Sequence, residues 1–152
     1  MKLSKQAKIF LSILVVSVLA LTMPVSAAEE IKIGVLTPLT AGAHQLGKEA
    51  VRGAEMAAEY INAKGGVLGR KVKVITEDDA GQVEKALSGF RKLTSQDKVV
   101  AIIGQVHSSN MIALINPSKR MNIPIFSTQA SSNKITESGA ATVFRTAAIG
   151  DD

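Results

Sequence analysis

The feature that most constrains the fold is an unbroken apolar run, Val99–Ile103, which is bounded by Lys98 and Gly104. A strand with one exposed face alternates apolar and polar residues, whereas this run has no alternation. It therefore predicts a strand that is buried on both faces. Such strands belong to parallel sheets with helices on each side. A helical pattern of apolar residues follows the run and opens at Ser108.

Ser108 is expected to cap the helix that it opens. Serine is favoured at the N-cap because its hydroxyl accepts a hydrogen bond from a backbone N–H that lacks a partner at the start of a helix. The start of a helix also attracts negative charge. The strand, the short loop and the capped helix together predict a site for a small anion.

Strands and helices are expected to alternate along the whole folded part. The expected strands are residues 31–36, 71–76, 99–103, 123–126 and 142–145, and the expected helices are residues 47–64, a segment from Val83 and a segment from Ser108 that Pro117 kinks or shortens. This alternation predicts an α/β fold, a doubly wound parallel sheet with right-handed crossovers. The second strand alternates in polarity, which places it at an edge.

The flavodoxin-like strand order 2-1-3-4-5 is the expected order of this sheet. In that order the switch point lies between the first and third strands, and ligands bind beyond the carboxyl ends of the strands there. Three loops, residues 37–46, 105–109 and 128–133, are expected to meet at this point. Their hydroxyl side chains favour a small polar ligand, although serines in such loops also serve as helix caps and turn residues.

Residues 1–27 have the layout of a secretory signal peptide. A basic start with three lysines precedes an apolar stretch, Ile9–Leu21, and the small residues Val25-Ser26-Ala27 offer a cleavage site before Ala28. The stretch is short and flanked unlike a transmembrane helix, although an uncleaved membrane anchor is the alternative. The folded part is expected to comprise residues 28–152.

Charge and cysteine content exclude several classes of protein for this exported part. The formal charge falls from +5 to +2 without the leader, because three lysines leave and no acidic residue does. No basic block or aromatic ladder for nucleic acid remains. The chain has no cysteine, so it has no disulfides and no thiol to lipidate. A soluble periplasmic protein is expected in preference to a surface lipoprotein.

Enzymatic motifs are incomplete. The segment Gly42–Glu49 matches the phosphate-binding P-loop motif at every position but the last. Glu49 stands there, where the motif has a Ser or Thr that holds Mg²⁺. His107-Ser108 lacks the glycine pattern of a nucleophile elbow, and no carboxylate is placed behind His107. His44 and His107 lack a clear third metal ligand. No catalytic residue, metal site or cofactor is predicted, and a one-domain enzyme or signalling module at the same switch point stays open.

Several segments of the sequence together match the pattern of a known family. They are Ile61–Val72, the opening Ile31–Gly34 with Gly47, the pair Asp78-Asp79, Gly104–Ser109 and Phe126–Ser132. Together they resemble the branched-chain amino acid-binding proteins, the type I periplasmic solute receptors of ABC importers. The resemblance implies a non-enzymatic receptor that closes around an amino acid by hinge motion. It also implies delivery of branched-chain or similar aliphatic amino acids to a permease of the inner membrane.

The resemblance assigns roles to individual residues. Ser108 matches the residue that holds the ligand carboxylate through its hydroxyl and backbone N–H, and Ala130 matches one whose carbonyl accepts from the ammonium group. Ser131 stands where the family usually has Thr and would contact the head group. Leu46 lies where members often have an aromatic residue beside the ligand side chain. Ser109 completes the expected ligand-binding set.

Two departures from the family bear on ligand and extent. Leu46 and Ser131 leave amides, urea and aromatic acids as alternative ligands, since related receptors take them. The chain stops at Asp152, near where the family's chain first crosses to its second lobe. Residues 28–152 are therefore expected to be the N-terminal part of the first lobe, with the second lobe absent.

The leader generates the first testable prediction. Cleavage is expected to leave a mature N-terminus at Ala28 or within about two residues of it, because signal peptidase cuts after small residues that follow an apolar stretch. Mass spectrometry of the protein recovered from the periplasm measures this directly. Periplasmic protein that retains Met1 would contradict it.

Overall fold

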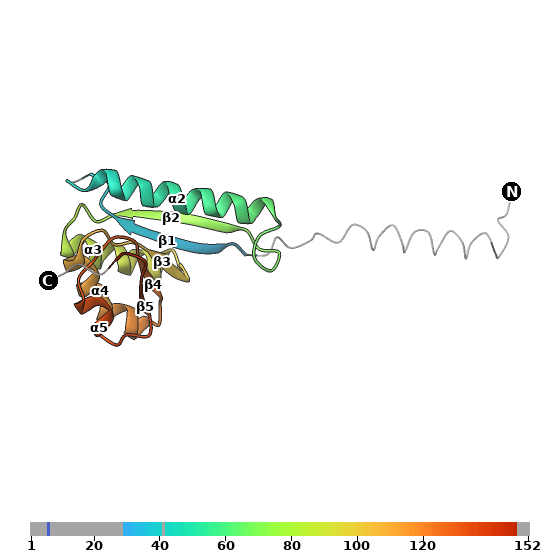
Figure 1. The fold of residues 1–152 in the computed structure, drawn as a ribbon. Helices are drawn as coiled ribbons and strands as arrows, with labels where there is room; N and C mark the ends of the chain where they lie inside the picture. The colour runs from blue at the N-terminus through green and yellow to red at the C-terminus, as the bar shows by residue number, and fades with distance from the viewer. Residues whose placement is uncertain (1–5, 7–28, 41, 149–152) are drawn as a thin grey trace.

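The computed structural model describes Gln6, residues 29–40 and residues 42–148. The elements in chain order are β1 Ile31–Thr37, α2 His44–Ala63, β2 Val72–Asp78, α3 Val83–Arg91, the π-helical segment η1 Lys92–Gln96, β3 Ala101–Ile103, α4 Ser108–Met121, β4 Ile125–Ser127, α5 Lys134–Glu137 and β5 Val143–Arg145 (Figure 1). The predicted signal peptide lies outside the described residues, apart from Gln6. Within the described part, no helix combines the length and apolar character needed to span a membrane.

The five strands form one sheet in the order β2-β1-β3-β4-β5. Every neighbouring pair is parallel, and β1 pairs with β2 along its whole length, from Ile31 opposite Val72 to Thr37 opposite Asp78. The predicted α/β class and strand order are confirmed. The edge position of β2, which its alternating sequence indicated, is confirmed as well.

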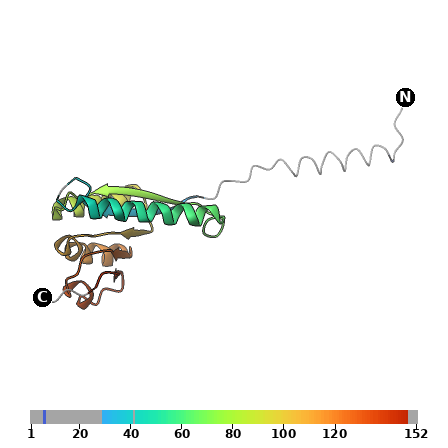
Figure 2. The same ribbon diagram turned by 45° about the horizontal axis from the view of Figure 1, so that its top comes forward.

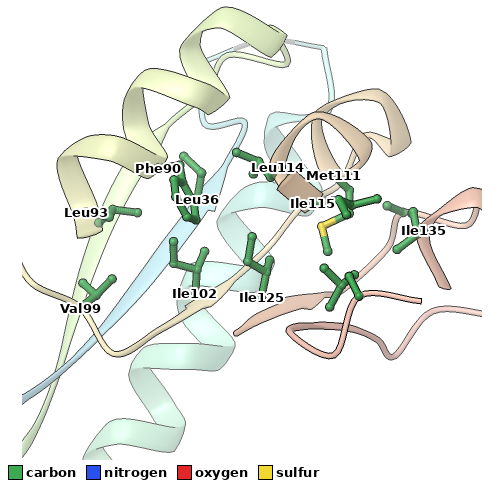
Figure 3. Close-up of a cluster of buried hydrophobic side chains, with 13 residues drawn as sticks. Leu36, Phe90, Leu93, Val99, Ile102, Met111, Leu114, Ile115, Ile125 and Ile135 are labelled. Atoms are coloured by element: carbon green, nitrogen blue, oxygen red, sulfur yellow. The ribbon is translucent and has the colours of Figure 1, made fainter. Parts of the chain in front are cut away.

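The main core lies between the sheet and the pair α3 and α4. Leu36, Ile102 and Ile125 come from three adjacent strands, and Phe90 of α3 and Leu114 of α4 pack in the same cluster (Figure 3). Each of these five residues has at most 1% of its surface exposed. Each fully buried side chain of this size contributes roughly 1.5–3 kcal/mol relative to exposure to water. This layer is the principal source of the fold's stability.

The opposite face of the sheet is covered only in part. Helix α2 runs along β1 and β2 in both views (Figures 1 and 2). Beside it an apolar groove of about 360 Å³ is lined by residues that include Ala58 of α2, Ile103 of β3 and Phe126 of β4. Phe126 and Phe144 remain 38% and 45% exposed, and their stacked rings have centroids 5.0 Å apart.

The predicted burial of the 99–103 run on both faces is therefore wrong in part. Ile102 is fully buried, but Ala101 and Ile103 line the open groove. Val100, which precedes the first residue of β3, is 53% exposed. The physical reason is coverage, because α3 and α4 pack against one face while α2 stops short of β3 on the other. Local hydrophobicity indicates what a strand could bury, whereas a packed partner decides what it does bury.

The structure also bears on two predictions about α4, and the predicted N-cap is wrong. Ser108 is the first residue of the helix and not its cap. His107 occupies the N-cap with an extended backbone, and no side chain caps the helix. The helix is not shortened at Pro117 but continues to Met121. It ends at Asn122, whose φ of 53° is the left-handed conformation that commonly terminates helices.

Gly47 allows α2 to approach the end of β1 closely. A Cβ atom at this position would lie 1.8 Å from the carbonyl oxygen of Pro38, a distance that no relaxed structure tolerates. Gly53 in the same helix is exposed, and a Cβ there would meet no atom within 4 Å. Gly47 therefore has no room for a side chain, whereas Gly53 in the same helix does.

Alanine substitution should separate these two glycines. Gly47→Ala is expected to destabilise the fold by about 1–3 kcal/mol, because the helix must shift away from β1. Gly53→Ala should stabilise it by about 0.5–1 kcal/mol, since alanine loses less backbone entropy in a helix. Urea unfolding followed by circular dichroism measures both changes. Destabilisation of similar size in the two variants would contradict this account of the packing.

Candidate functional site

The carboxyl ends of β1, β3 and β4 meet at one edge of the sheet. Their registers bring Thr37, Gln105 and Thr128 to this edge. A Cβ at Gly104 would lie 2.0 Å from the carbonyl oxygen of Leu36, so the loop after β3 passes directly against β1. The three loops that the sequence placed at the switch point do converge there, which is where open parallel sheets bind ligands.

Two hydrogen bonds join the loop after β3 and the start of α4 to the loop after β4. The Ala130 N–H donates to the Gln105 carbonyl over 3.3 Å, and the Ser132 N–H donates to the Ser108 hydroxyl oxygen, also over 3.3 Å. The Gln105 carbonyl additionally accepts from the Ser127 hydroxyl at 3.4 Å. These contacts hold the first turn of α4 beside the segment that carries Ala130.

The residues expected to bind ligand differ in their exposure. Ser108 is half-buried, Ser109 and Ser131 are exposed, and Ala130 has no exposed surface. Leu46 lies on the first turn of α2 and is 40% exposed. The structure thus brings Ser108 and Ala130 into linked loops, while Leu46 belongs to the third loop region of the same edge.

Ser132, which was not among the expected ligand-binding residues, is the serine that contacts Ser108. The exposed Ser131 has its backbone carbonyl bound by Arg145 instead. Sequence reasoning noted both serines as hydroxyl residues of one loop but could not tell which one faces α4. That choice depends on the direction of a single peptide plane, for which the sequence carries no signal.

Unpaired buried polar atoms gather at this edge. Nine such side-chain atoms occur among the described residues, and they belong to Thr37, Asp79, Gln105, His107, Asn110, Thr128, Gln129 and Asn133. All of these residues follow or end β1, β2, β3 or β4, so all lie on the carboxyl-end side of the sheet. Buried polar groups in folded proteins are nearly always hydrogen-bonded. Their concentration makes this edge the candidate polar site.

Asp78 fastens the loop after β1 to the end of β2. Its Oδ1 accepts from the backbone N–H groups of Leu39 and Ala80, each at 2.8 Å, and its Oδ2 accepts from the Thr40 hydroxyl at 2.5 Å. Burial acts to raise the pKa of the Asp78 carboxyl, but these hydrogen bonds, led by that of Thr40, lower it below the ordinary value. A carboxylate at the end of a strand can cap the turn that follows through such bonds, and Asp78 does so here.

His107 has a carboxylate nearby, but no hydrogen bond joins His107 Nδ1 to Asp79 Oδ2. The His107 ring packs against Gly81, whose N–H donates to Asp79 Oδ1 at 2.7 Å. However, Asp79 Oδ2 and His107 Nδ1 each lack a hydrogen-bond partner. Among the described residues, no three His, Cys, Asp or Glu side chains are grouped so that they could hold a metal ion. The groups that the arrangement offers are hydrogen-bonding ones.

A family model described as "Periplasmic binding protein" matches residues 30–151 of this chain. A relative, the Leu/Ile/Val-binding protein homolog 7 of Brucella suis biovar 1, is 36% identical over 138 residues, which are 91% of this chain and 34% of the relative. The chain therefore spans about a third of the length of this relative.

Solved structures share the fold. The branched-chain amino acid transporter substrate-binding protein LivJ of Streptococcus pneumoniae, in complex with isoleucine, matches with a TM-score of 0.72 and 28% identity, over 76% of this chain and 33% of that one. A solute-binding protein of an ABC transporter from Rhodopseudomonas palustris BisB5, in complex with 3,4-dihydroxybenzoic acid, matches with a TM-score of 0.68 and 27% identity, over 78% and 31%.

The Asp78 hydrogen bonds predict a specific dependence of stability on pH. Because its pKa is lowered in the folded state, its contribution is complete above the unfolded pKa and is lost as the pH falls through the folded one. Asp78→Asn should therefore lower the free energy of unfolding by roughly 1 kcal/mol at neutral pH, a value reduced by partial exposure. The difference from the unsubstituted chain should shrink toward about pH 2.

Urea unfolding at a series of pH values measures this difference. Glu55→Gln on the exposed side of α2 is the matched control and should leave the unfolding free energy almost unchanged at every pH. A deficit of constant size for Asp78→Asn from neutral to acidic pH would show that the carboxylate charge contributes nothing.

Proposed function

The chain belongs to the periplasmic binding protein family, and from this premise we propose that it binds the head group of a branched-chain or similar aliphatic amino acid. It would do so as the N-terminal part of a receptor in the periplasm that delivers its ligand to an ABC permease of the inner membrane. The proposed role is binding without catalysis, and it needs no metal or cofactor. Relatives named for leucine, isoleucine and valine support this ligand class.

The observation that carries the proposal is the position of Ser108 at the start of α4. The helix has 14 residues, and its first N–H groups have no partner within the helix, so they favour a carboxylate. The Ser108 oxygen already accepts a hydrogen bond from Ser132, which leaves the Ser108 hydrogen available to donate. A carboxylate placed here would receive both hydroxyl and backbone hydrogen bonds.

The neighbouring loop supports recognition of the ammonium group. The Ala130 N–H is occupied by the Gln105 carbonyl, and the Ala130 carbonyl is the group proposed to accept from the ligand. An α-amino acid carries its carboxylate and ammonium groups on one carbon atom. The two hydrogen bonds link the segments that carry Ser108 and Ala130, which supports the proposal that both serve one such head group.

An aromatic acid is the second candidate ligand. A structural neighbour is described in complex with 3,4-dihydroxybenzoic acid, which has a carboxylate but no ammonium group. Such a ligand would use the α4 N-terminus and Ser108, without needing the Ala130 carbonyl. Binding of leucine but not of 3,4-dihydroxybenzoate would favour the amino acid.

Titration followed by nuclear magnetic resonance tests the proposal. Residues 28–152 should bind leucine with a Kd of about 1 mM or weaker, because one lobe leaves the ligand partly in water, where its hydrogen bonds contribute less. Ser108→Ala should weaken this binding about threefold to tenfold, less than the full effect of an enclosed hydrogen bond to a charged group. Shifts of the Ser108 and Ala130 amides report binding at the site.

Ser88→Ala, an exposed substitution on α3, is the control and should leave the affinity unchanged. Equal affinities of Ser108→Ala and the unsubstituted chain would remove Ser108 from the site. Micromolar binding of leucine by residues 28–152 would show that this lobe needs no second one to enclose its ligand.

A further inference from the structure

Arg145, the last residue of β5, reaches back over the loop after β4. Its Nη1 donates to the carbonyl of Ser131 at 2.6 Å and to the carbonyl of Ser132 at 3.0 Å, and its Nη2 donates to the Thr136 hydroxyl at 3.3 Å. The planar guanidinium presents several donors in a fixed geometry, and hydrogen bonds from a charged donor are stronger than neutral ones. Arg145 therefore restrains a segment that has no regular secondary structure.

The first of these bonds acts on the peptide unit that contacts Ser108. The Ser131 carbonyl and the Ser132 N–H belong to one planar peptide, and in a trans peptide they point in opposite directions. The carbonyl faces Arg145, while the N–H donates to the Ser108 hydroxyl oxygen. By holding the carbonyl, Arg145 sets the direction of the N–H.

We propose that Arg145 is a positioning residue for ligand binding, which orients the Ser108 hydroxyl through the Ser131–Ser132 peptide. The Ser108 oxygen accepts from this peptide, so its hydrogen points elsewhere and is available to the ligand carboxylate. Hydrogen bonds arranged in a chain polarise one another, which makes the hydroxyl a better donor. This inference rests on the proposed function, because it assigns Arg145 a role only through the contact between Ser108 and the ligand.

A purely structural role is the competing explanation, since Arg145 also donates to Thr136 of α5, the helix that follows the same loop. A structural residue would change affinity independently of Ser108, whereas a positioning residue would act only while Ser108 is present. A double-mutant cycle separates these cases because coupling between two residues appears as non-additivity.

The cycle uses residues 28–152, which contain the whole described fold, with leucine as the probe. Arg145→Met keeps an unbranched apolar stem and removes the guanidinium, and it should weaken leucine binding about threefold to tenfold. In the Ser108→Ala background the same substitution should change affinity by less than about twofold. Equal effects of Arg145→Met in both backgrounds would overturn the proposal.

Two matched controls address the remaining contacts. Thr136→Val removes the acceptor of Nη2 but leaves both carbonyl contacts, and it should not change leucine affinity. Arg52→Met removes an exposed arginine on α2 and controls for the loss of positive charge. A loss of affinity in Thr136→Val as large as that in Arg145→Met would assign the effect to loop stability and overturn the proposal.

Hydrogen exchange without ligand provides an independent readout and also covers variants with weak binding. Arg145→Met, or Arg145→Lys if the first variant folds poorly, should accelerate exchange of the Ser132 amide more than that of core amides such as Ile102. Uniform acceleration, or unchanged Ser132 protection, would overturn the proposed orientation. Absence of leucine shifts in the unsubstituted chain would instead refute the proposed function, while exchange still tests the contact between Arg145 and the peptide.

Discussion

The structure depends on the burial of one layer of apolar side chains under α3 and α4. Leu36, Ile102 and Ile125 stand side by side on β1, β3 and β4, and two helices cover them. Because the strands are parallel, this packing brings their carboxyl ends to one edge together with the start of α4. The position of the polar site is thus a consequence of how the core is buried.

The polar edge is held in shape by groups that do not belong to the core. Asp78 ties the loop after β1 to β2, and Arg145 ties the loop after β4 to β5. Both use charged side chains to bind backbone groups, which is stronger than a neutral hydrogen bond. Other polar atoms of the edge, including both amide atoms of Gln105, lack partners inside the described part of the chain.

The two faces of the sheet are stabilised unequally. The face toward α3 and α4 is closed, whereas the other is covered by α2 over β1 and β2 and remains open beside Phe126. The stacked rings of Phe126 and Phe144 recover part of the apolar contact on that side. The chain that shows this asymmetry spans about a third of the length of the Brucella suis relative.

The sequence by itself determined the α/β class and the edge position of β2, because these follow from the alternation of strands and helices and from hydrophobic period. The strand order followed from the fold class that this alternation predicted, and the structure confirms it. Its motifs also identified the family. Only the tertiary structure decided that Val100 is exposed, that His107 and not Ser108 occupies the N-cap, and that Ser132 contacts Ser108. For the same reason, the sequence did not predict that Arg145 binds the carbonyls of Ser131 and Ser132. Such contacts depend on coverage by distant elements and on the direction of single peptide planes, which no local pattern of residues encodes.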